Sequence, residues 1–221
     1  GLDDPEHYTT AADMALLMAE GLRNRAFAAL TCQKSASVRF VKPSGKCVTY
    51  SNHNRLLRMY KDCIGGKTGY TEAAGRCLVS AARRDNVTLI CVTLNDRSDW
   101  DDHIALYEEG FSRLYGARSG DSAVRIEVPC VGGEQDTVTF VGSRDAAYVV
   151  ARGSESRVKR KVYLDAFVYA PVRAGETPGR IDYLLDGRRL DSVPLKAAAS
   201  VAAKTVKTSV FQKIKEFFTY G

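Results

Sequence analysis

The sequence has 221 residues, of which 45% are hydrophobic and 26% are charged, and its formal net charge is +6. These proportions are typical of a globular chain and exclude intrinsic disorder, and six cysteines in so long a chain exclude a small disulfide-rich scaffold. No run approaches the roughly 18 apolar residues of a membrane-spanning helix.

The excess positive charge is concentrated at the carboxyl end, because residues 204–221 contain four lysines and a single glutamate. No basic stripe with interleaved aromatic residues runs through the rest of the chain, so we expect no nucleic-acid binding. A basic end instead indicates an anionic surface such as a membrane.

The cysteines are scattered and lack the spacing of a metal site. No two of them form a Cys-x-x-Cys pair, and the three histidines are far apart in the sequence. We therefore expect no structural zinc and no other metal. The redox compartment stays open, because scattered cysteines fit either a reducing environment or an unrecognised disulfide. The six are Cys32, Cys47, Cys63, Cys77, Cys91 and Cys130.

The amino-terminal part predicts a helix followed by a hairpin. Residues 9–24 are amphipathic, with Thr10 as the N-cap. Residues 36–51 predict a hairpin that turns at 43–45, and the glycine pair at 65–66 predicts a further turn. The expected apolar face of the helix consists of Ala12, Leu16, Met18 and Ala19.

A second hairpin and a longer helix follow. The runs 77–82 and 88–94 predict strands joined by a turn at 83–86, and residues 100–115 predict a helix with acidic residues toward its start. Hairpins combined with helices indicate an α+β fold for residues 1–118. The expected buried face of the second helix consists of Ile104, Leu106, Tyr107, Phe111 and Leu114.

The chain changes character after residue 118. The polar segment 116–121 is rich in turn residues, so we place a domain boundary there. Residues 119–195 alternate as short strands with a tight turn at Asp186-Gly187, which predicts a small all-β sandwich domain. Residues 196–221 are expected to form an Ala-rich linker and a carboxyl-terminal amphipathic helix.

The sharpest motif is the run Gly66-Lys67-Thr68-Gly69. A phosphate-binding loop would need a further glycine at position 61, which is Lys61, and no strand–loop–helix pattern surrounds the run, so we expect no nucleotide site. Lys-Thr-Gly opening an edge strand suits a carboxylate ligand, since charge-assisted hydrogen bonds are worth about 1.5–3 kcal/mol each. The glycine would let a ligand backbone approach. As a bare string, the same residues also fit a plain turn.

Several stretches of the first 118 residues resemble one enzyme family in their order and spacing. They are Gly1-Leu2-Asp3, the run from His7 to Ala15, Asn52-His53-Asn54-Arg55-Leu56-Leu57, and Gly66 to Thr71 with Ala74-Gly75. This part resembles the later half of the catalytic domain of serine D-alanyl-D-alanine carboxypeptidases, the low-molecular-mass penicillin-binding proteins of peptidase family S11. The resemblance implies a partial penicillin-binding/β-lactamase-like transpeptidase domain. Residues 119–195 resemble the β-rich domain that follows it there, and the tail resembles the family's amphipathic membrane anchor.

The resemblance implies acyl transfer on a serine. In the family, Ser-x-x-Lys, Ser-x-Asn and Lys-Thr-Gly build the site in that chain order, and the serine attacks the D-Ala-D-Ala bond of peptidoglycan stem peptides. By this resemblance, Lys67 and Thr68 bind the terminal carboxylate of the substrate, and Gly69 lets the peptide lie against the strand. His53 stands where some members carry Arg, and Tyr70 stands where some carry His. We count both as substrate-binding candidates, although His53 fits a surface or capping histidine equally well.

The first two elements of that site are missing. The one Ser-x-x-Lys string, from Ser156 to Lys159, follows Lys-Thr-Gly in the chain instead of preceding it, so we attribute it to chance. We therefore expect a carboxyl-terminal fragment whose catalytic serine and general-base lysine lie upstream of Gly1. On its own, such a fragment should be inactive.

The resemblance also implies partners and a location. The substrate would be a stem peptide ending in D-Ala-D-Ala, β-lactam antibiotics would acylate the same serine, and no cofactor is implied. Residues 204–221 would hold the protein peripherally on an anionic membrane surface, at the extracytoplasmic face of the bacterial cytoplasmic membrane. As a helix they bring six apolar side chains into an arc of roughly 140°, although such a helix could also dock on its own protein. The six are Val206, Val210, Phe211, Ile214, Phe217 and Phe218.

Two other functions stay open. A serine β-lactamase also uses Lys-Thr-Gly, although the added β domain and the amphipathic tail argue against it. A non-catalytic protein that binds D-amino-acid peptides or the cell envelope would fit a chain that never had the serine.

Overall fold

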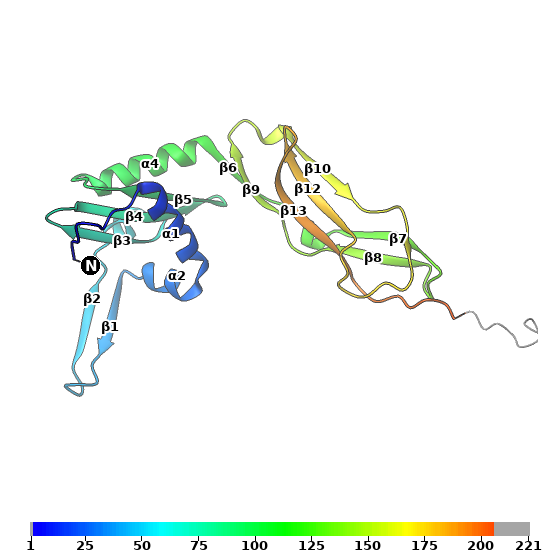
Figure 1. The fold of residues 1–221 in the computed structure, drawn as a ribbon, viewed down its shortest axis with the longest axis horizontal. Coiled ribbons are helices and arrows are strands. Elements are labelled where there is room, and N and C mark those ends of the chain that lie inside the picture. Colours follow the sequence, from blue (N-terminus) through cyan, green and yellow to red (C-terminus); the bar gives the residue numbers. More distant parts are fainter. Residues whose placement is uncertain (1, 206–221) are drawn as a thin grey trace, which may run out of the picture. The chain divides into compact units, whose positions relative to one another are not determined.

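The computed structural model describes residues 2–205, which form two compact units (Figure 1). Of the described residues, 2–117 and 149–155 form the first unit, and 118–148 and 156–205 form the second. The amphipathic helix predicted for the tail lies outside the described residues from 206 onward. Within the described part of the chain, no helix is both long and apolar enough to cross a membrane.

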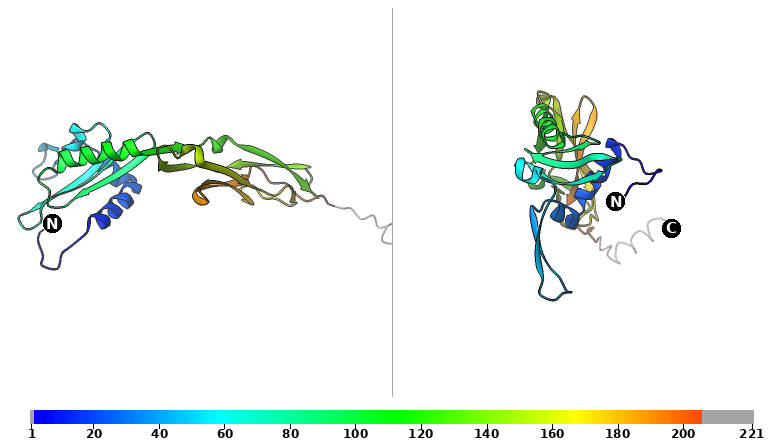
Figure 2. Two further views of the ribbon diagram at one scale, coloured as in Figure 1. Left: turned by 90° about the horizontal axis from the view of Figure 1, so that it is seen from above. Right: turned by 90° about the vertical axis from the view of Figure 1, so that its left-hand side faces the viewer.

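The first unit is built on a three-stranded antiparallel sheet with β4 in its centre. Helices α1 and α4 lie on its two opposite faces (Figure 2). Its elements are α1 (Ala11–Arg23), α2 (Arg25–Thr31), β1 (Ser35–Arg39), β2 (Cys47–Ser51), α3 (Leu56–Met59), β3 (Cys63–Thr71), β4 (Gly75–Arg84), β5 (Val87–Thr93), α4 (Asp99–Arg113), β6 (Leu114–Arg118) and β9 (Ala147–Ala151), which pairs with β6. The mixed α+β architecture predicted from the sequence is confirmed.

Alternate residues of β4 serve two separate cores. Leu78 packs in a cluster with Tyr107 and Phe111 of α4, whereas Val79 packs in a cluster with Met18 of α1. Because successive side chains of a strand point to opposite faces, a strand covered on both sides is apolar at nearly every position. This explains the continuous apolar run in the sequence, and each large side chain buried in this way contributes about 1.5–3 kcal/mol.

Side-chain caps set the limits of the first two helices. The hydroxyl oxygen of Thr10 accepts a hydrogen bond from the backbone N–H of Asp13 at 3.1 Å, so the predicted N-cap is confirmed. Asn24 ends α1 and begins α2, since its side-chain oxygen accepts from the N–H of Ala26 at 2.9 Å. The sequence analysis did not predict α2 as a separate helix.

The predicted apolar face of α1 is wrong except for Met18. The row that faces the sheet is Met14, Met18 and Leu22, at four-residue spacing. Leu16 and Leu17 are 69% and 65% exposed. The sheet accommodates one narrow row of the helix, so the opposite leucines stay on the surface.

Both predicted hairpins are present. β1 pairs with β2 from Ser35 opposite Ser51 onward. β4 and β5 are joined by Asp85 and Asn86 alone, which have φ angles of 47° and 64°. Two positive φ angles are typical of a type I′ turn, so the turn is shorter than the predicted 83–86.

The turn predicted at Gly65-Gly66 is wrong, because both glycines lie inside β3. A Cβ atom on Gly66 would approach the side-chain nitrogen of Asn54 and the carbonyl oxygen of Val79 to 2.7 Å each. The glycines are therefore required for close packing around the strand rather than for a reversal of the chain.

Helix α4 confirms the predicted burial of Tyr107 and Phe111. The prediction for Leu106 is wrong, because that side chain is 49% exposed. The helix instead buries polar residues at its start, Asp99 and His103, which the apolar pattern could not indicate.

The second unit is all-β apart from two short 3-10 turns. Its strands form one six-stranded arrangement in the order β10-β12-β13-β8-β7-β11. The long strand β13 pairs with β12 and then, from Leu195 to Ala197, with β8, so it joins two layers around one core. The strands are β7 (Arg125–Val131), β8 (Thr137–Gly142), β10 (Val158–Tyr163), β11 (Val168–Tyr169), β12 (Gly179–Leu185) and β13 (Arg188–Ala197).

The segment expected to be a linker, residues 196–203, is packed onto this second unit. Ala197 and Val201 are buried in its core, and Val201 pairs with Val172. The small side chains that suggested a linker instead allow this segment to pack tightly against the core of the second unit.

Candidate functional site

Strand β3 is an edge strand, and its outer side pairs with no other strand of the described residues. Thr31, at the end of α2, donates its hydroxyl to the carbonyl oxygen of Gly66 at 2.7 Å and accepts from the N–H of Gly66 at 3.0 Å. The backbone groups of Gly66 therefore point away from β4. Because these groups alternate sides along a strand, the next outward-facing groups belong to Thr68 and Tyr70. An extended ligand can pair with them as an added strand.

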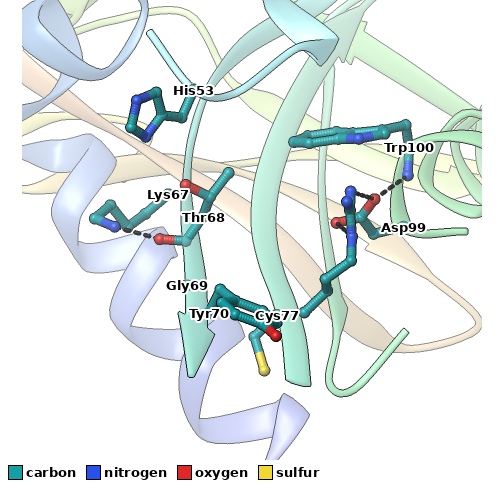
Figure 3. A pocket seen from close by; sticks show the side chains of 9 residues that line it. His53, Lys67, Thr68, Gly69, Tyr70, Cys77, Asp99 and Trp100 are labelled. Carbon is teal, nitrogen blue, oxygen red and sulfur yellow. Dashed lines mark hydrogen bonds and ion pairs between the residues drawn. The ribbon is translucent and has the colours of Figure 1, made fainter. Parts of the chain in front are cut away.

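The structure brings all five sequence-predicted site residues together. They line one pocket with a volume of about 710 Å³ at this edge (Figure 3). Lys67 to Tyr70 come from β3, and His53 comes from the loop before α3. Four further residues complete the lining. The nine are His53, Lys67, Thr68, Gly69, Tyr70, Arg76, Cys77, Asp99 and Trp100.

The Lys-Thr-Gly run lies in the middle of β3 rather than at its opening. The Lys67 ammonium donates to the carbonyl oxygen of Thr68, which leaves its other protons free for a ligand. Among residues 2–205, a Cβ atom on Gly69 would meet nothing closer than the Cβ of Cys77 at 3.9 Å. Internal packing therefore does not require a glycine at this position, in contrast to Gly66.

His53 is held at the pocket by its two neighbours. Asn52 accepts from the backbone N–H of Asn54 at 2.9 Å, and Asn54 in turn accepts from that of Leu56 at 3.1 Å. The N-cap position of α3 is occupied by Arg55, so His53 does not cap that helix. Its place is in the pocket wall.

Arg76, Cys77, Asp99 and Trp100 are the lining residues that sequence reasoning missed. The hairpin register offered a signal for two of them, because Cys77 lies opposite Gly69 and Arg76 lies opposite Tyr70. Asp99 and Trp100 come from the first turn of α4, and no sequence pattern connects that turn with β3.

Arg76 is held firmly by Asp99. Its Nη2 lies 2.6 Å from Oδ1 of Asp99 and its Nε lies 3.3 Å from Oδ2, so the two groups pair through both nitrogens. This hydrogen bonding raises the pKa of the Arg76 guanidinium above its usual range. The guanidinium carbon also lies 5.6 Å from the centre of the Trp100 ring.

A buried polar cluster supports β4 behind the pocket. The hydroxyl of Ser80 lies 2.7 Å from Nδ1 of His103 and 2.6 Å from the hydroxyl of Tyr107, and Nε2 of His103 lies 3.1 Å from the hydroxyl of Thr93. Burial lowers the pKa of His103 to about 4 and raises the pKa of Tyr107. Both groups are therefore neutral at pH 7 and fix β4 and β5 against α4.

No serine lines the pocket in the described part of the chain. The Ser-x-x-Lys string is exposed in the second unit, where Ser156 lies in a 3-10 turn and Lys159 lies on β10. Residues 2–205 bring no three His, Cys, Asp or Glu side chains together as a metal-binding group.

Two family models match the chain. Residues 1–98 match the D-alanyl-D-alanine carboxypeptidase model, and residues 119–203 match the model of the penicillin-binding protein 5 carboxyl-terminal domain. The chain is 25% identical over 206 residues to the D-alanyl-D-alanine carboxypeptidase DacF of Bacillus subtilis, which covers 89% of this chain and 51% of DacF. It is 28% identical over 204 residues to DacC of Escherichia coli, which covers 88% of this chain and 49% of DacC.

A solved structure resembles the fold. Penicillin-binding protein 5 of Haemophilus influenzae superposes with a TM-score of 0.65 at 28% identity, over 91% of this chain and 59% of that one. The chain thus spans about half the length of the curated relatives it matches.

Proposed function

Since the chain belongs to the D-alanyl-D-alanine carboxypeptidase family, we propose that it forms the substrate-binding half of a serine enzyme that removes the terminal D-Ala from peptidoglycan stem peptides. The observation that supports this most directly is the Lys67-Thr68-Gly69 run on an exposed strand edge, in a pocket with His53. A strand edge binds an extended peptide, and an ammonium beside a hydroxyl binds its terminal carboxylate.

Each residue has a role in this proposal. Lys67 and Thr68 bind the carboxylate of the terminal D-Ala, and Tyr70 offers backbone groups to the peptide. Gly69 leaves room for the ligand, because no contact among the described residues requires a glycine there. His53 lines the same pocket and contacts the carboxylate end of the peptide.

The nucleophile comes from outside these 221 residues. Acyl transfer needs an activated serine next to the bound peptide, and the pocket lining formed by residues 2–205 contains no serine. The chain alone is therefore inactive. The domain assignment proposed with this function is half of a catalytic domain in residues 1–118, a β domain that begins at residue 119 and includes the packed segment 196–203, and a membrane-surface helix in the residues that follow.

Penicillin binding and location complete the proposal. A β-lactam acylates the serine that lies outside this chain, and the carboxylate of the β-lactam binds to Lys67 and Thr68. The protein lies peripherally on the extracytoplasmic face of the cytoplasmic membrane, where the lysines of residues 204–221 contact anionic headgroups.

One observation favours a second candidate. Because no serine lines the pocket, the same residues could bind D-Ala-D-Ala peptides without cleaving them, as part of a non-catalytic envelope protein.

The two candidates differ in turnover. We would express the complete reading frame that contains this chain and measure both D-Ala release and labelling by a fluorescent penicillin. We expect both activities, a loss of about 10–100-fold in kcat/KM for Lys67→Ala, and no labelling of the 221-residue chain by itself. A complete protein that binds the peptide but neither releases D-Ala nor takes up penicillin would establish the second candidate instead.

A further inference from the structure

The pocket contains one more cation than the proposed function uses. Its charged lining consists of Lys67 and Arg76 against a single carboxylate, Asp99. Lys67 is assigned to the terminal carboxylate of the peptide, so the role of Arg76 is left unexplained by that assignment.

Arg76 is fixed on one side and open on the other. The Asp99 side chain is 4% exposed and pairs with Nε and Nη2, whereas the Arg76 side chain is 42% exposed. No described residue accepts a hydrogen bond from Nη1 of Arg76. A guanidinium anchored by a buried carboxylate retains donors for a second anion and loses little entropy in binding it.

The spacing relates Arg76 to a definite part of a bound peptide. Arg76 lies opposite Tyr70, which is three residues beyond Lys67 along β3. At about 3.3 Å per residue, this separates the two positions by about 10 Å along the strand. In a peptide that is extended from Lys67 toward Tyr70, the third residue from the carboxyl end lies about 7 Å from the terminal residue, so its side chain and that of Arg76 together span the remaining distance.

We propose that Arg76 is a substrate-binding residue that selects D-Ala-D-Ala peptides whose third residue from the carboxyl end has a side-chain carboxylate. This selection rests on the proposed function of the same pocket. A side-chain ammonium finds no free acid in the pocket, because Asp99 is already paired with Arg76. The preference is therefore for a carboxylate over a neutral group, and for a neutral group over an ammonium.

A purely structural role for Arg76 makes a different prediction. Asp99 also accepts from the backbone N–H of Trp100 at 2.9 Å, so the ion pair helps to fix the first turn of α4. If this were its whole role, loss of Arg76 would weaken all peptides equally. The preference among peptides is the quantity that separates the two roles.

Trp100 supplies the assay, because it is the single tryptophan of the sequence and lies in the pocket wall. We would titrate the 221-residue chain with acetyl-X-D-Ala-D-Ala peptides in which X is L-Glu, L-Gln or L-Lys, and follow the tryptophan fluorescence. Variants Arg76→Gln and Arg76→Lys test the guanidinium. The doubly substituted Arg76→Gln/Asp99→Asn avoids leaving a buried carboxylate unpaired. Arg83→Gln is the matched control, since it lies on the same strand and bonds Thr88 outside the pocket.

We expect the chain to bind the Glu peptide about tenfold more tightly than the Gln peptide, as for one partly solvated charge-assisted hydrogen bond. Arg76→Gln and the double variant should abolish this ratio and leave the affinity for the Gln peptide within about twofold. Arg83→Gln should behave like the unsubstituted chain. The proposal is overturned if the tenfold preference for the Glu peptide over the Gln peptide persists in both Arg76→Gln and Arg76→Gln/Asp99→Asn. It is also overturned if these variants lose affinity equally for all three peptides.

Failure of the underlying function gives a separate result. Lys67→Ala should weaken all three peptides by about tenfold or more, because each has the same terminal carboxylate. If Lys67→Ala has no effect, or if no peptide binds saturably, the carboxylate site itself is refuted and the selection falls with it. If Lys67→Ala weakens binding but the Glu to Gln ratio is one, only the role of Arg76 is refuted.

Discussion

The stability of the first unit should fall between pH 7 and pH 5 because of one buried histidine. His103 is fully buried between β4 and α4, and burial lowers its pKa to about 4 even though the nearby carboxylates of Asp99 and Asp96 act in the opposite direction. In the unfolded chain the ordinary pKa is about 6.5. Between these two values the unfolded state binds the additional proton, so acidification favours unfolding.

The magnitude follows from the two pKa values. A difference of about 2.5 units corresponds to at most about 3.4 kcal/mol, which is fully present above pH 6.5 and is lost progressively down to pH 4. From pH 7 to pH 5 the loss should be about 2 kcal/mol. The hydrogen bonds of Glu108 lower its pKa to about 2, so that carboxylate remains ionised in the native state throughout this window.

The assay is urea unfolding followed by the fluorescence of Trp100, which lies in the first unit and is the single tryptophan. His103→Gln removes the titrating group and should reduce the pH-dependent loss to near zero. Ser80→Ala is the matched control, because it removes a hydrogen-bond partner of His103 but keeps the imidazole buried. Both variants are expected to be less stable at pH 7 by about 1–3 kcal/mol.

The informative quantity is the change in the free energy of unfolding between pH 7 and pH 5, measured separately for each variant. Equal losses in His103→Gln and in the unsubstituted chain would refute the reasoning, because the titrating group would then lie elsewhere. A Ser80→Ala variant without pH dependence would show that the hydrogen bond, rather than burial, lowers the pKa of His103.

Three further results are expected. Gly66→Ala should lower the free energy of unfolding by about 1–3 kcal/mol in urea titrations, because Gly66 is closely packed. Gly69→Ala should leave the free energy of unfolding unchanged, because Gly69 faces open space, but it should weaken peptide binding. Asp121→Ala should destabilise the second unit by about 3–5 kcal/mol, measured by near-UV circular dichroism, since this buried carboxylate accepts hydrogen bonds from an arginine, a serine and a tyrosine. The exposed Leu16 and Leu17 should make the chain self-associate in sedimentation velocity, and replacing both by Lys should reduce this association; unchanged association would place the associating surface elsewhere.

Local patterns in the sequence predicted most of the elements. Thr10 identified the start of α1, and the Asp186-Gly187 pair identified the turn between β12 and β13, where both φ angles are positive. These signals succeed because capping and tight turns depend on residues close together in the chain. The prediction of the apolar face of α1 was wrong, because periodicity identifies candidate apolar rows of a helix but not the row that packs against the sheet.

The candidate site divides in the same way. Lys67, Thr68 and Gly69 are adjacent in the chain, so the sequence alone indicated a carboxylate-binding motif. His53 and Tyr70 came from the resemblance rather than from spacing. Tyr70 shares β3 with the motif and His53 comes from the loop before α3, and the role of each one is a proposal.

Short-range patterns were sufficient for the α+β class, the Thr10 cap, the hairpin turns and the Lys-Thr-Gly motif, because each depends on neighbours within a few residues. The packing of β3 in three dimensions was needed to show that Gly66 is closely packed whereas Gly69 faces open space. The packing also shows that Arg76 and Asp99 form an ion pair in the pocket that Lys67 lines. Those contacts depend on how β3, β4 and α4 pack together, and no local pattern encodes the burial that fixes an ion pair between separate elements.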